Sequence, residues 1–331
     1  MPPPIANSRR VIIATGAALL AMVAGWPAYA QWKPEKNVEI VVGLAAGSFQ
    51  DHTGRLLQRI IQEQKLIGTS SSVVNRAGGG GSIAWAYLAQ RANDPHTLLI
   101  TSPTILTSNI IGATPYSYTD FTPVATLSGQ YIALAVNTNS AIKSGRDLLE
   151  RLKKDINSVT FANNGRGSNL HILMGLVAAS AGVDVKKLKI AIFQGGGELT
   201  TAVLGGHVDV ISTATSNILP HYVSGKLRII GIGAPQRLGG ALANVATWKE
   251  QGVDAVVHNW SGVMGPRGMT AAQLAAWDEV FGKIVKTDEW KTDLERNFQE
   301  PAYLTSRETA VYLREQHALM RAALVDLGLA K

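Results

Sequence analysis

VEIVVGLAAGSFQDHTGRLL, residues 38–57, is the stretch that decides the fold class of this chain. Its first five residues form a short apolar run of the kind that makes a buried strand. From residue 52 to 64, leucines and isoleucines recur at the spacing that places them on one face of a helix. Small residues and glycines separate the two patterns. A strand, a glycine-containing loop and a helix in this order indicate an α/β fold with parallel strands.

The same alternation continues along the chain. We expect further strands at residues 72–74, 97–100, 131–136, 158–162, 189–193, 208–212 and 227–233, and helices at 82–91, 171–181 and 198–204. Ser82 is expected to cap the second helix. Thr270 with Gln273 and Thr305 with Glu308 fit the capping box that opens a helix, so the C-terminal part is expected to be rich in helices.

Two series of α/β units without a Pro- or Ser-rich linker predict two lobes that share the chain. We place the crossings near residues 128 and 233, which gives one lobe of residues 31–128 plus 233–331 and a second lobe of residues 129–232. The predicted architecture is two mixed sheets flanked by helices, with a ligand cleft between the lobes.

The first thirty residues have the pattern of a cleaved signal peptide. Arg9 and Arg10 precede the apolar run 11–24, and Ala28-Tyr29-Ala30 supplies a cleavage signal. A run of 14 residues is shorter than the roughly 20 that a membrane-spanning helix needs. We therefore expect export to the periplasm. The paired arginines also resemble a twin-arginine signal, and the choice between the Tat and Sec routes stays open.

Composition excludes several classes of protein. Residues 31–331 carry 29 Lys and Arg against 24 Asp and Glu, a formal charge of +5 without a run of like charges, which argues against nucleic acid as a partner. The chain has no cysteine, so it forms no disulfide and carries no lipid on cysteine. It lacks the zinc-protease motif HExxH and the nucleophile elbow GxSxG. We expect no enzyme activity, no metal and no cofactor.

Two loops between a strand and a helix are the candidate ligand site. In open α/β sheets, ligands bind beyond the carboxyl ends of the strands, where helix N-termini offer unpaired N–H groups to an anion. The candidate residues are Ala46, Gly47, Ser48, Phe49, Gln50 and Asp51 in the first loop, and Asn163, Asn164, Gly165, Arg166, Gly167, Ser168 and Asn169 in the second.

Single positions in these loops allow more than one role. Asp51 fits the N-cap of the helix at 52–64 better than a catalytic acid. Arg166 could contact a ligand carboxylate in bidentate fashion or point into solvent. The glycine run 78–81 lacks the Lys-Ser/Thr pair of a nucleotide-binding P-loop, which argues against a nucleotide.

The order of these segments resembles the substrate-binding proteins of tripartite tricarboxylate transporters, often called Bug receptors. The resemblance covers nearly all of the chain after residue 30. The stretches that carry it are VEIVVGLAAGSFQDHTGRLL (38–57), VVNRAGGGGSIAWAYLAQ (73–90), DPHTLLITS (94–102), DFTPVA (120–125), FANNGRGSNLH (161–171), FQGGGELTTAVLGGHVDV (193–210) and PHYVSGKLRIIGI (220–232).

The resemblance implies a type II periplasmic-binding-protein fold that closes around a small organic carboxylate. It implies that the two loops hold this ligand, largely through backbone N–H groups, and that the receptor delivers it to a membrane permease. We expect a monomer. Phe49 and Arg166 depart from the family pattern and leave the ligand undefined. A sensor that docks on a two-component receptor is the alternative, and an exported α/β enzyme is a more distant one.

Overall fold

The structure, a computed structural model, describes residues 1, 32–193 and 196–331. Residues Lys33–Lys331 form one compact unit, which is the part of the molecule described below. The predicted signal peptide lies, apart from Met1, outside the described residues. Within them, no helix combines the length and the apolar character that crossing a bilayer requires.

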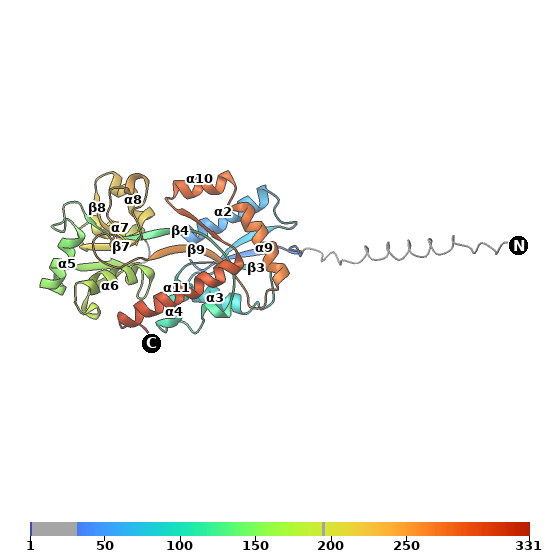
Figure 1. Cartoon of the computed structure of the whole chain (residues 1–331), viewed down its shortest axis with the longest axis horizontal. Helices are drawn as coiled ribbons and strands as arrows, with labels where there is room; N and C mark the ends of the chain where they lie inside the picture. Colours follow the sequence, from blue (N-terminus) through green and yellow to red (C-terminus); the bar gives the residue numbers. More distant parts are fainter. Residues whose placement is uncertain (2–31, 194–195) are drawn as a thin grey trace. The chain divides into compact units, whose positions relative to one another are not determined.

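Strands and helices alternate as the sequence predicted, and the structure adds the strands His258–Gly265 and Glu300–Leu304 and the helices Thr104–Ile110, Gly145–Lys154 and Thr215–Val223 (Figure 1). The strands are β1 Val38–Val42, β2 Ser71–Asn75, β3 Thr97–Thr101, β4 Thr122–Asn137, β5 Thr160–Asn163, β6 Lys189–Ile192, β7 Val210–Ala214, β8 Leu227–Ile232, β9 His258–Gly265 and β10 Glu300–Leu304. The helices are α2 Phe49–Glu63, α3 Ser82–Ala89, α4 Thr104–Ile110, α5 Gly145–Lys154, α6 Asn169–Ser180, α7 Gly196–Leu204, α8 Thr215–Val223, α9 Ala271–Ile284, α10 Asp288–Arg296 and α11 Ser306–Asp326.

Two helix caps differ from the prediction. The first helix begins at Phe49, and its N-cap is Ser48 rather than Asp51. Ser82 is the first residue of α3 and not its cap, because Gly81 occupies the cap position with a φ of 107°. Both predicted capping boxes, at Thr270 and Thr305, are confirmed.

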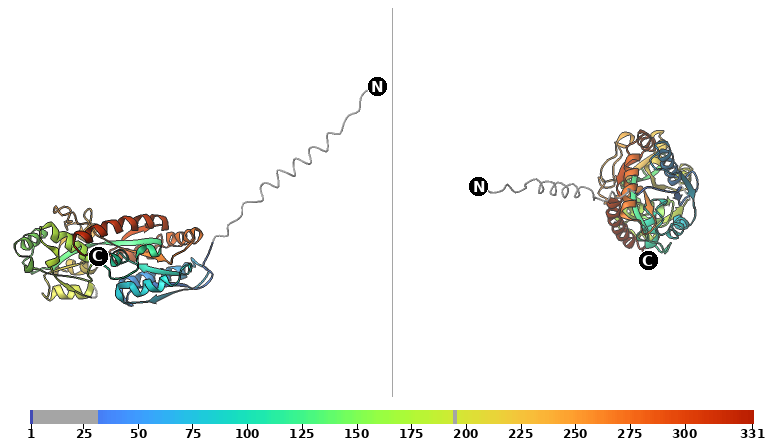
Figure 2. Two further views of the ribbon diagram at one scale, coloured as in Figure 1. Left: turned by 90° about the horizontal axis from the view of Figure 1, so that it is seen from below. Right: turned by 90° about the vertical axis from the view of Figure 1, so that its right-hand side faces the viewer.

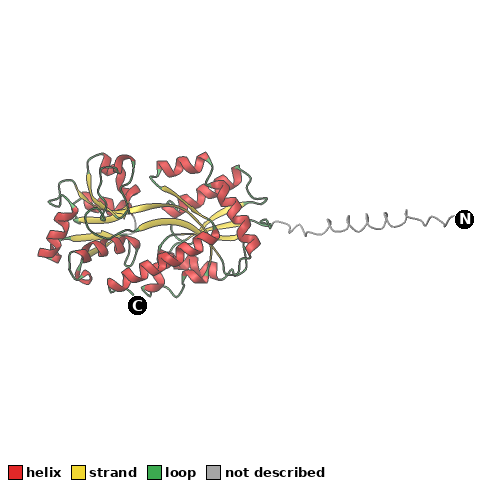
Figure 3. Ribbon diagram, viewed as in Figure 1, coloured by secondary structure: helices red, strands yellow, loops and turns green. Residues whose placement is uncertain are grey.

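The strands form two parallel groups joined by two antiparallel strands. The strand order is β2-β1-β3-β9-β4-β7-β5-β6, with β8 and β10 also paired to β4. Strands β1, β2 and β3 form the first strand group, and β5, β6 and β7 form the second; within each group the strands are parallel. The long strand β4 pairs with β9 through its first part and with β7 through its second, as Figure 3 shows in yellow.

The register makes the two groups point toward each other. Strand β3 runs in the same direction as β4, because β9 is antiparallel to both. Strand β7 is antiparallel to β4, and its last residue, Ala214, pairs with Ile132. Through Gly262 of β9, the last residue of β3, Thr101, lies level with Thr126 of β4. The carboxyl ends of both groups therefore meet near residues 126–132 of β4.

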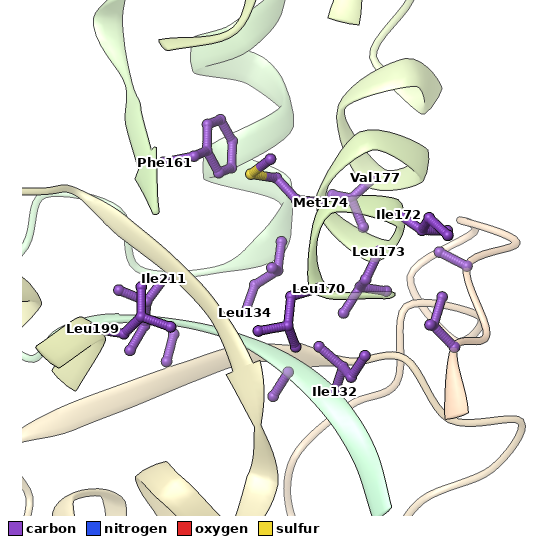
Figure 4. Close-up of a cluster of buried hydrophobic side chains, with 14 of the residues drawn as sticks. Ile132, Leu134, Phe161, Leu170, Ile172, Leu173, Met174, Val177, Leu199 and Ile211 are labelled. Carbon is purple, nitrogen blue, oxygen red and sulfur yellow. The ribbon is translucent and has the colours of Figure 1, made fainter. Parts of the chain in front are cut away.

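Helices cover both groups, and their apolar faces make the core. Helices α5, α6, α7 and α8 lie around the second group, and α2, α3 and α9 around the first (Figure 1). Helix α11 runs past both groups and contacts α4, α9 and α6; it is red in both views of Figure 2. Figure 4 shows part of the core, where Phe161, Met174 and Ile211 are all fully buried. Each such side chain stabilises the fold by roughly 1.5–3 kcal/mol.

Candidate functional site

The predicted loops leave the carboxyl ends of β1 and β5, so they start where the two strand groups converge. Loop 43–48 follows β1 and loop 164–168 follows β5. Each leads directly into a helix, α2 or α6, whose first N–H groups have no partner within the helix. The arrangement places two helix N-termini at the junction of the groups, and a helix N-terminus favours negative charge.

The first loop is fastened by the residues that open α2. Gly47 adopts a φ of 78°, which is strained for any residue with a Cβ. The hydroxyl of Ser48 accepts the N–H of Asp51 at 3.2 Å. In return, the carboxylate of Asp51 accepts the N–H of Gly47 at 2.9 Å. The two hydrogen bonds fix the backbone between residues 47 and 51.

Asp51 is a buried carboxylate with further partners. Its side chain accepts hydrogen bonds from Arg55 Nε and Asn75 Nδ2, each at 2.9 Å. The hydrogen bond from Arg55 is the main reason that its pKa is lowered to about 2, and the bonds from Gly47 and Asn75 act in the same direction. Since these donors occupy the carboxylate, Asp51 holds the loop in place and is not available as a proton acceptor near neutral pH.

The second loop repeats the same construction. Gly167 has a φ of 73°, and Ser168 is the N-cap of α6, with its hydroxyl accepting the N–H of His171 at 3.3 Å. The ring nitrogen Nδ1 of His171 accepts the N–H of Gly167 at 3.0 Å. Burial and the nearby charge of Arg166 lower the pKa of His171 to about 4, so the ring is neutral at pH 7 and Nδ1 is free to accept.

Both loops contain backbone donors without a partner among the described residues. Within the described chain, no hydrogen bond engages the N–H groups of Ala46, Phe49 and Gln50 in the first loop or of Asn164, Arg166 and Asn169 in the second. Ala46 and Asn164 lie at exposed positions, and Phe49 is half-buried. Unpaired N–H groups at a helix N-terminus are the kind of donor that binds carboxylates.

The remaining predicted side chains have different surroundings. Gln50 donates to Ser102 after β3, at 3.1 Å, and Asn169 donates to Asn259 of β9, at 2.8 Å. The side chain of Asn163 is fully buried; its Oδ1 accepts the N–H of Gly165, whereas its Nδ2 has no hydrogen-bond partner among the described residues.

The side chain of Arg166 lies apart from the first loop. It is exposed and lines a pocket beside α6, to which no residue of the first loop contributes. Among the described residues, no hydrogen bond or ion pair joins residues 46–51 directly to residues 163–169.

The sequence analysis missed three residues that support the loops: Asn75, Ser102 and Asn259. Asn75 and Ser102 end or follow strands β2 and β3, the neighbours of β1. Polar residues at the carboxyl ends of strands next to a candidate loop are the signal that would have found them. Asn259 lies in β9, where only the tertiary pairing brings it near α6.

The fold and the two loops define the class of protein. A mixed α/β sheet flanked by helices, with two parallel groups converging on a shared pair of strands, is the architecture of periplasmic solute-binding proteins. Within the described residues, no three His, Cys, Asp or Glu side chains gather in a way that could hold a metal ion.

Comparisons with known proteins give the family. Residues 55–329 match the family model described as "Tripartite tricarboxylate transporter family receptor". The chain is 28% identical over 267 residues to Protein BugT of Bordetella pertussis, covering 79% of this chain and 80% of the relative. This chain belongs to the tripartite tricarboxylate transporter receptor family, whose members are periplasmic solute-binding receptors rather than enzymes.

Solved structures share the fold. The chain superposes with a TM-score of 0.77 on the periplasmic binding protein BugD, at 21% identity, covering 90% of this chain and 99% of that one. A protein of R. palustris solved with adipate gives a TM-score of 0.79 at 22% identity, with the same coverage.

Proposed function

We propose that this chain is a periplasmic receptor that captures a small organic carboxylate between residues 46–51 and 163–169 and delivers it to a membrane permease of the tripartite tricarboxylate type. The two loops belong to separate lobes with the boundaries given by the sequence analysis, and the exported protein acts as a monomer. The predicted signal peptide carries it to the periplasm.

One observation carries this proposal. Two helix N-termini with unused N–H groups stand at the facing carboxyl ends of β1 and β5, and both are built on a glycine of positive φ. Hydrogen bonds to a charged group contribute roughly 1.5–3 kcal/mol each. Four or five of them, less the cost of immobilising the ligand and closing the protein around it, give about −8 kcal/mol, which is micromolar affinity.

Membership of the family supports the transport role, and the adipate bound to the R. palustris protein supports the ligand class. Donors from the backbone recognise a carboxylate and not the rest of the molecule. The length and substituents of the ligand then depend on the side chains around it, among which the bulky Phe49 is the departure from the family pattern.

A thermal-shift screen of the mature protein tests the ligand class. The panel contains adipate, malate, citrate, benzoate and amino acids, with neutral sugars as controls. A ligand at about one hundred times its Kd stabilises the folded state by roughly 2.7 kcal/mol, which raises Tm by several degrees. A shift with acids only is the expected result, and a shift with neutral sugars only contradicts the proposal.

A pair of glycine substitutions tests the site. Gly47 and Gly182 have φ values of 78° and 75°, and at both positions a Cβ would meet open space. Gly47→Ala and Gly182→Ala therefore cost similar stability, roughly 1–2 kcal/mol. Because Gly182 follows the C-terminal end of α6, only Gly47→Ala is expected to weaken binding, by tenfold or more in calorimetric titration. Equal affinities of the two variants would place the ligand elsewhere.

A further inference from the structure

A second pocket lies on the flank of α6, away from the first loop. It encloses about 230 Å3 between α6, the segment 185–192 and the chain after α11. The apolar residues of its lining include Leu188, Ile190, Leu327 and Leu329. None of residues 43–51 lines the pocket, and of the second loop only Arg166 does, so the pocket lies to the side of the space between the two loops.

Three nitrogen-bearing side chains stand at this pocket: Arg166, His171 and Lys186. Neither Arg166 nor Lys186 forms an ion pair with a carboxylate of the described residues. Because Nδ1 of His171 accepts the N–H of Gly167, the ring proton is on Nε2, and the neutral ring is a hydrogen-bond donor at that atom. Two unpaired cations and a donor beside an apolar wall are complementary to an anion with an apolar body.

One of the two cations is held near the pocket by the surrounding chain. The aliphatic stem of Lys186 lies directly over Gly328, where any Cβ would collide with it. Gly175 of α6 makes room for Leu327 in the same way, since a Cβ there would lie 2.7 Å from the methyl groups of that leucine. The tail after α11 is thus fitted against α6, and the pocket between them has a defined shape.

We propose that this pocket is a second site, specific for a small monocarboxylate with a short apolar chain. The carboxylate lies between Lys186 and Arg166, and the apolar chain lies against Leu188, Ile190 and Leu329. An apolar cavity of about 150 Å3 holds a benzene-sized molecule. The volume of about 230 Å3 accommodates an acid of the size of hexanoate or benzoate. The site shares Arg166 with the second loop of the function proposed above, but none of residues 46–51 lines it, so it does not depend on capture between the two loops.

Hexanoate and its neutral analogue hexanamide are the probes. In two-dimensional NMR of the 15N-labelled mature protein, hexanoate is expected to shift the amides of Leu188, Ile190 and Leu329 at millimolar concentration, and hexanamide to shift them at least fivefold less at equal concentration. A titration that moves only Gly47 and Ser48 shows binding in the proposed carboxylate site and overturns the second site. Because the two sets of amides are separate, either proposal can fail without the other.

Neighbouring lysines supply a matched control. Lys186→Gln removes a charge at the pocket, whereas Lys187→Gln removes an equal charge from a side chain that is 71% exposed and lies 3.8 Å from Asp184. We expect Lys186→Gln to weaken hexanoate at least fivefold and Lys187→Gln less than twofold. Equal effects of the two substitutions would mean that only general surface charge attracts the acid, which contradicts the proposal.

Discussion

The two loops make a natural comparison, because they solve one problem with different acceptors. Each loop has a glycine of positive φ, a serine N-cap and, at the fifth position, a residue whose side chain accepts the glycine N–H. The two segments are Gly47-Ser48-Phe49-Gln50-Asp51 and Gly167-Ser168-Asn169-Leu170-His171. In the first loop the acceptor is an anion paired with Arg55. In the second it is a neutral imidazole.

Because the acceptors differ, the same backbone conformation is surrounded by a different net charge in each loop. The charge of Asp51 is balanced by Arg55, so the first loop presents helix N–H groups without added charge. Around His171 the balance is positive, because the ring is neutral and Arg166 has no carboxylate partner among the described residues. The surroundings differ as well: a Cβ at Gly47 meets open space, whereas one at Gly167 would lie 2.8 Å from Ile111.

The largest effect is expected from the glycine of the second loop. Gly167→Ala combines backbone strain of roughly 1–2 kcal/mol with a clash of roughly 1–3 kcal/mol against Ile111, whereas Gly47→Ala carries the strain alone. We expect a loss of about 3 kcal/mol for Gly167→Ala in urea unfolding and about half of that for Gly47→Ala. Gly167→Ala combined with Ile111→Ala tests the packing explanation, because it should cost less than the sum of the two single changes.

The neutral acceptor of the second loop predicts a dependence on pH. The folded-state pKa of His171 is about 4, below its ordinary value of 6.5, so the unfolded chain binds a proton between these values and the folded chain does not. Stability therefore falls as pH drops from 7 to 5, by about 2 kcal/mol for this group.

Replacing His171 tests that dependence. His171→Gln keeps an acceptor for the N–H of Gly167. The variant should lose about 2 kcal/mol less unfolding free energy between pH 7 and 5 than the natural protein does. His258, whose pKa burial lowers to about 4, gives the control: His258→Gln should reduce the loss similarly without weakening binding at the second loop. An unchanged pH profile for both variants would refute the buried neutral state.

The charged acceptor of the first loop predicts a different dependence on pH: the stability that Asp51 contributes persists to lower pH than the stability that depends on the neutral His171. The pKa of Asp51 is lowered to about 2, so the stability it contributes is complete above its ordinary pKa of 3.8 and is lost as pH falls through about 2. We expect Asp51→Asn to cost about 1–2 kcal/mol at pH 7, a value reduced for solvent screening of the half-exposed Arg55. In urea unfolding, the difference in unfolding free energy between the variant and the natural protein should fall to about half of its pH 7 value by pH 3. A constant difference would mean that the charge is not what stabilises the loop.

The smallest effect is expected for the cation itself. Arg55→Gln removes the ion pair but leaves Asp51 its bonds to Gly47 and Asn75, so we expect a loss below about 1 kcal/mol. Arg59→Gln is the matched control, since Arg59 also belongs to α2, is equally exposed and pairs with Glu289. We expect the two variants to have similar unfolding midpoints in urea and only Arg55→Gln to bind the ligand more weakly. This result would show that Arg55 acts on the first loop and not only on the stability of α2.

Much of the fold could be predicted because its signals are local. The apolar run 38–42 and the helical spacing after it specify β1 and α2 within a few residues, and the capping box at Thr270 marks the start of α9. The sequence does not specify the cap of α2, because Ser48 and Asp51 are both good cap residues and their spacing alone does not say which of them accepts. In the structure each accepts an N–H from the other side of the turn.

The sequence by itself determined the order of strands and helices, the two glycine-containing loops and the family resemblance, since periodicity, glycine and turn chemistry act over a few residues. Only the tertiary structure decided that the two strand groups point at each other, that His171 is buried and neutral, that Asn259 supports Asn169, and that Arg166 and Lys186 line one pocket. These features depend on strand register and on burial, which bring together residues far apart in the chain, and no local pattern encodes such contacts.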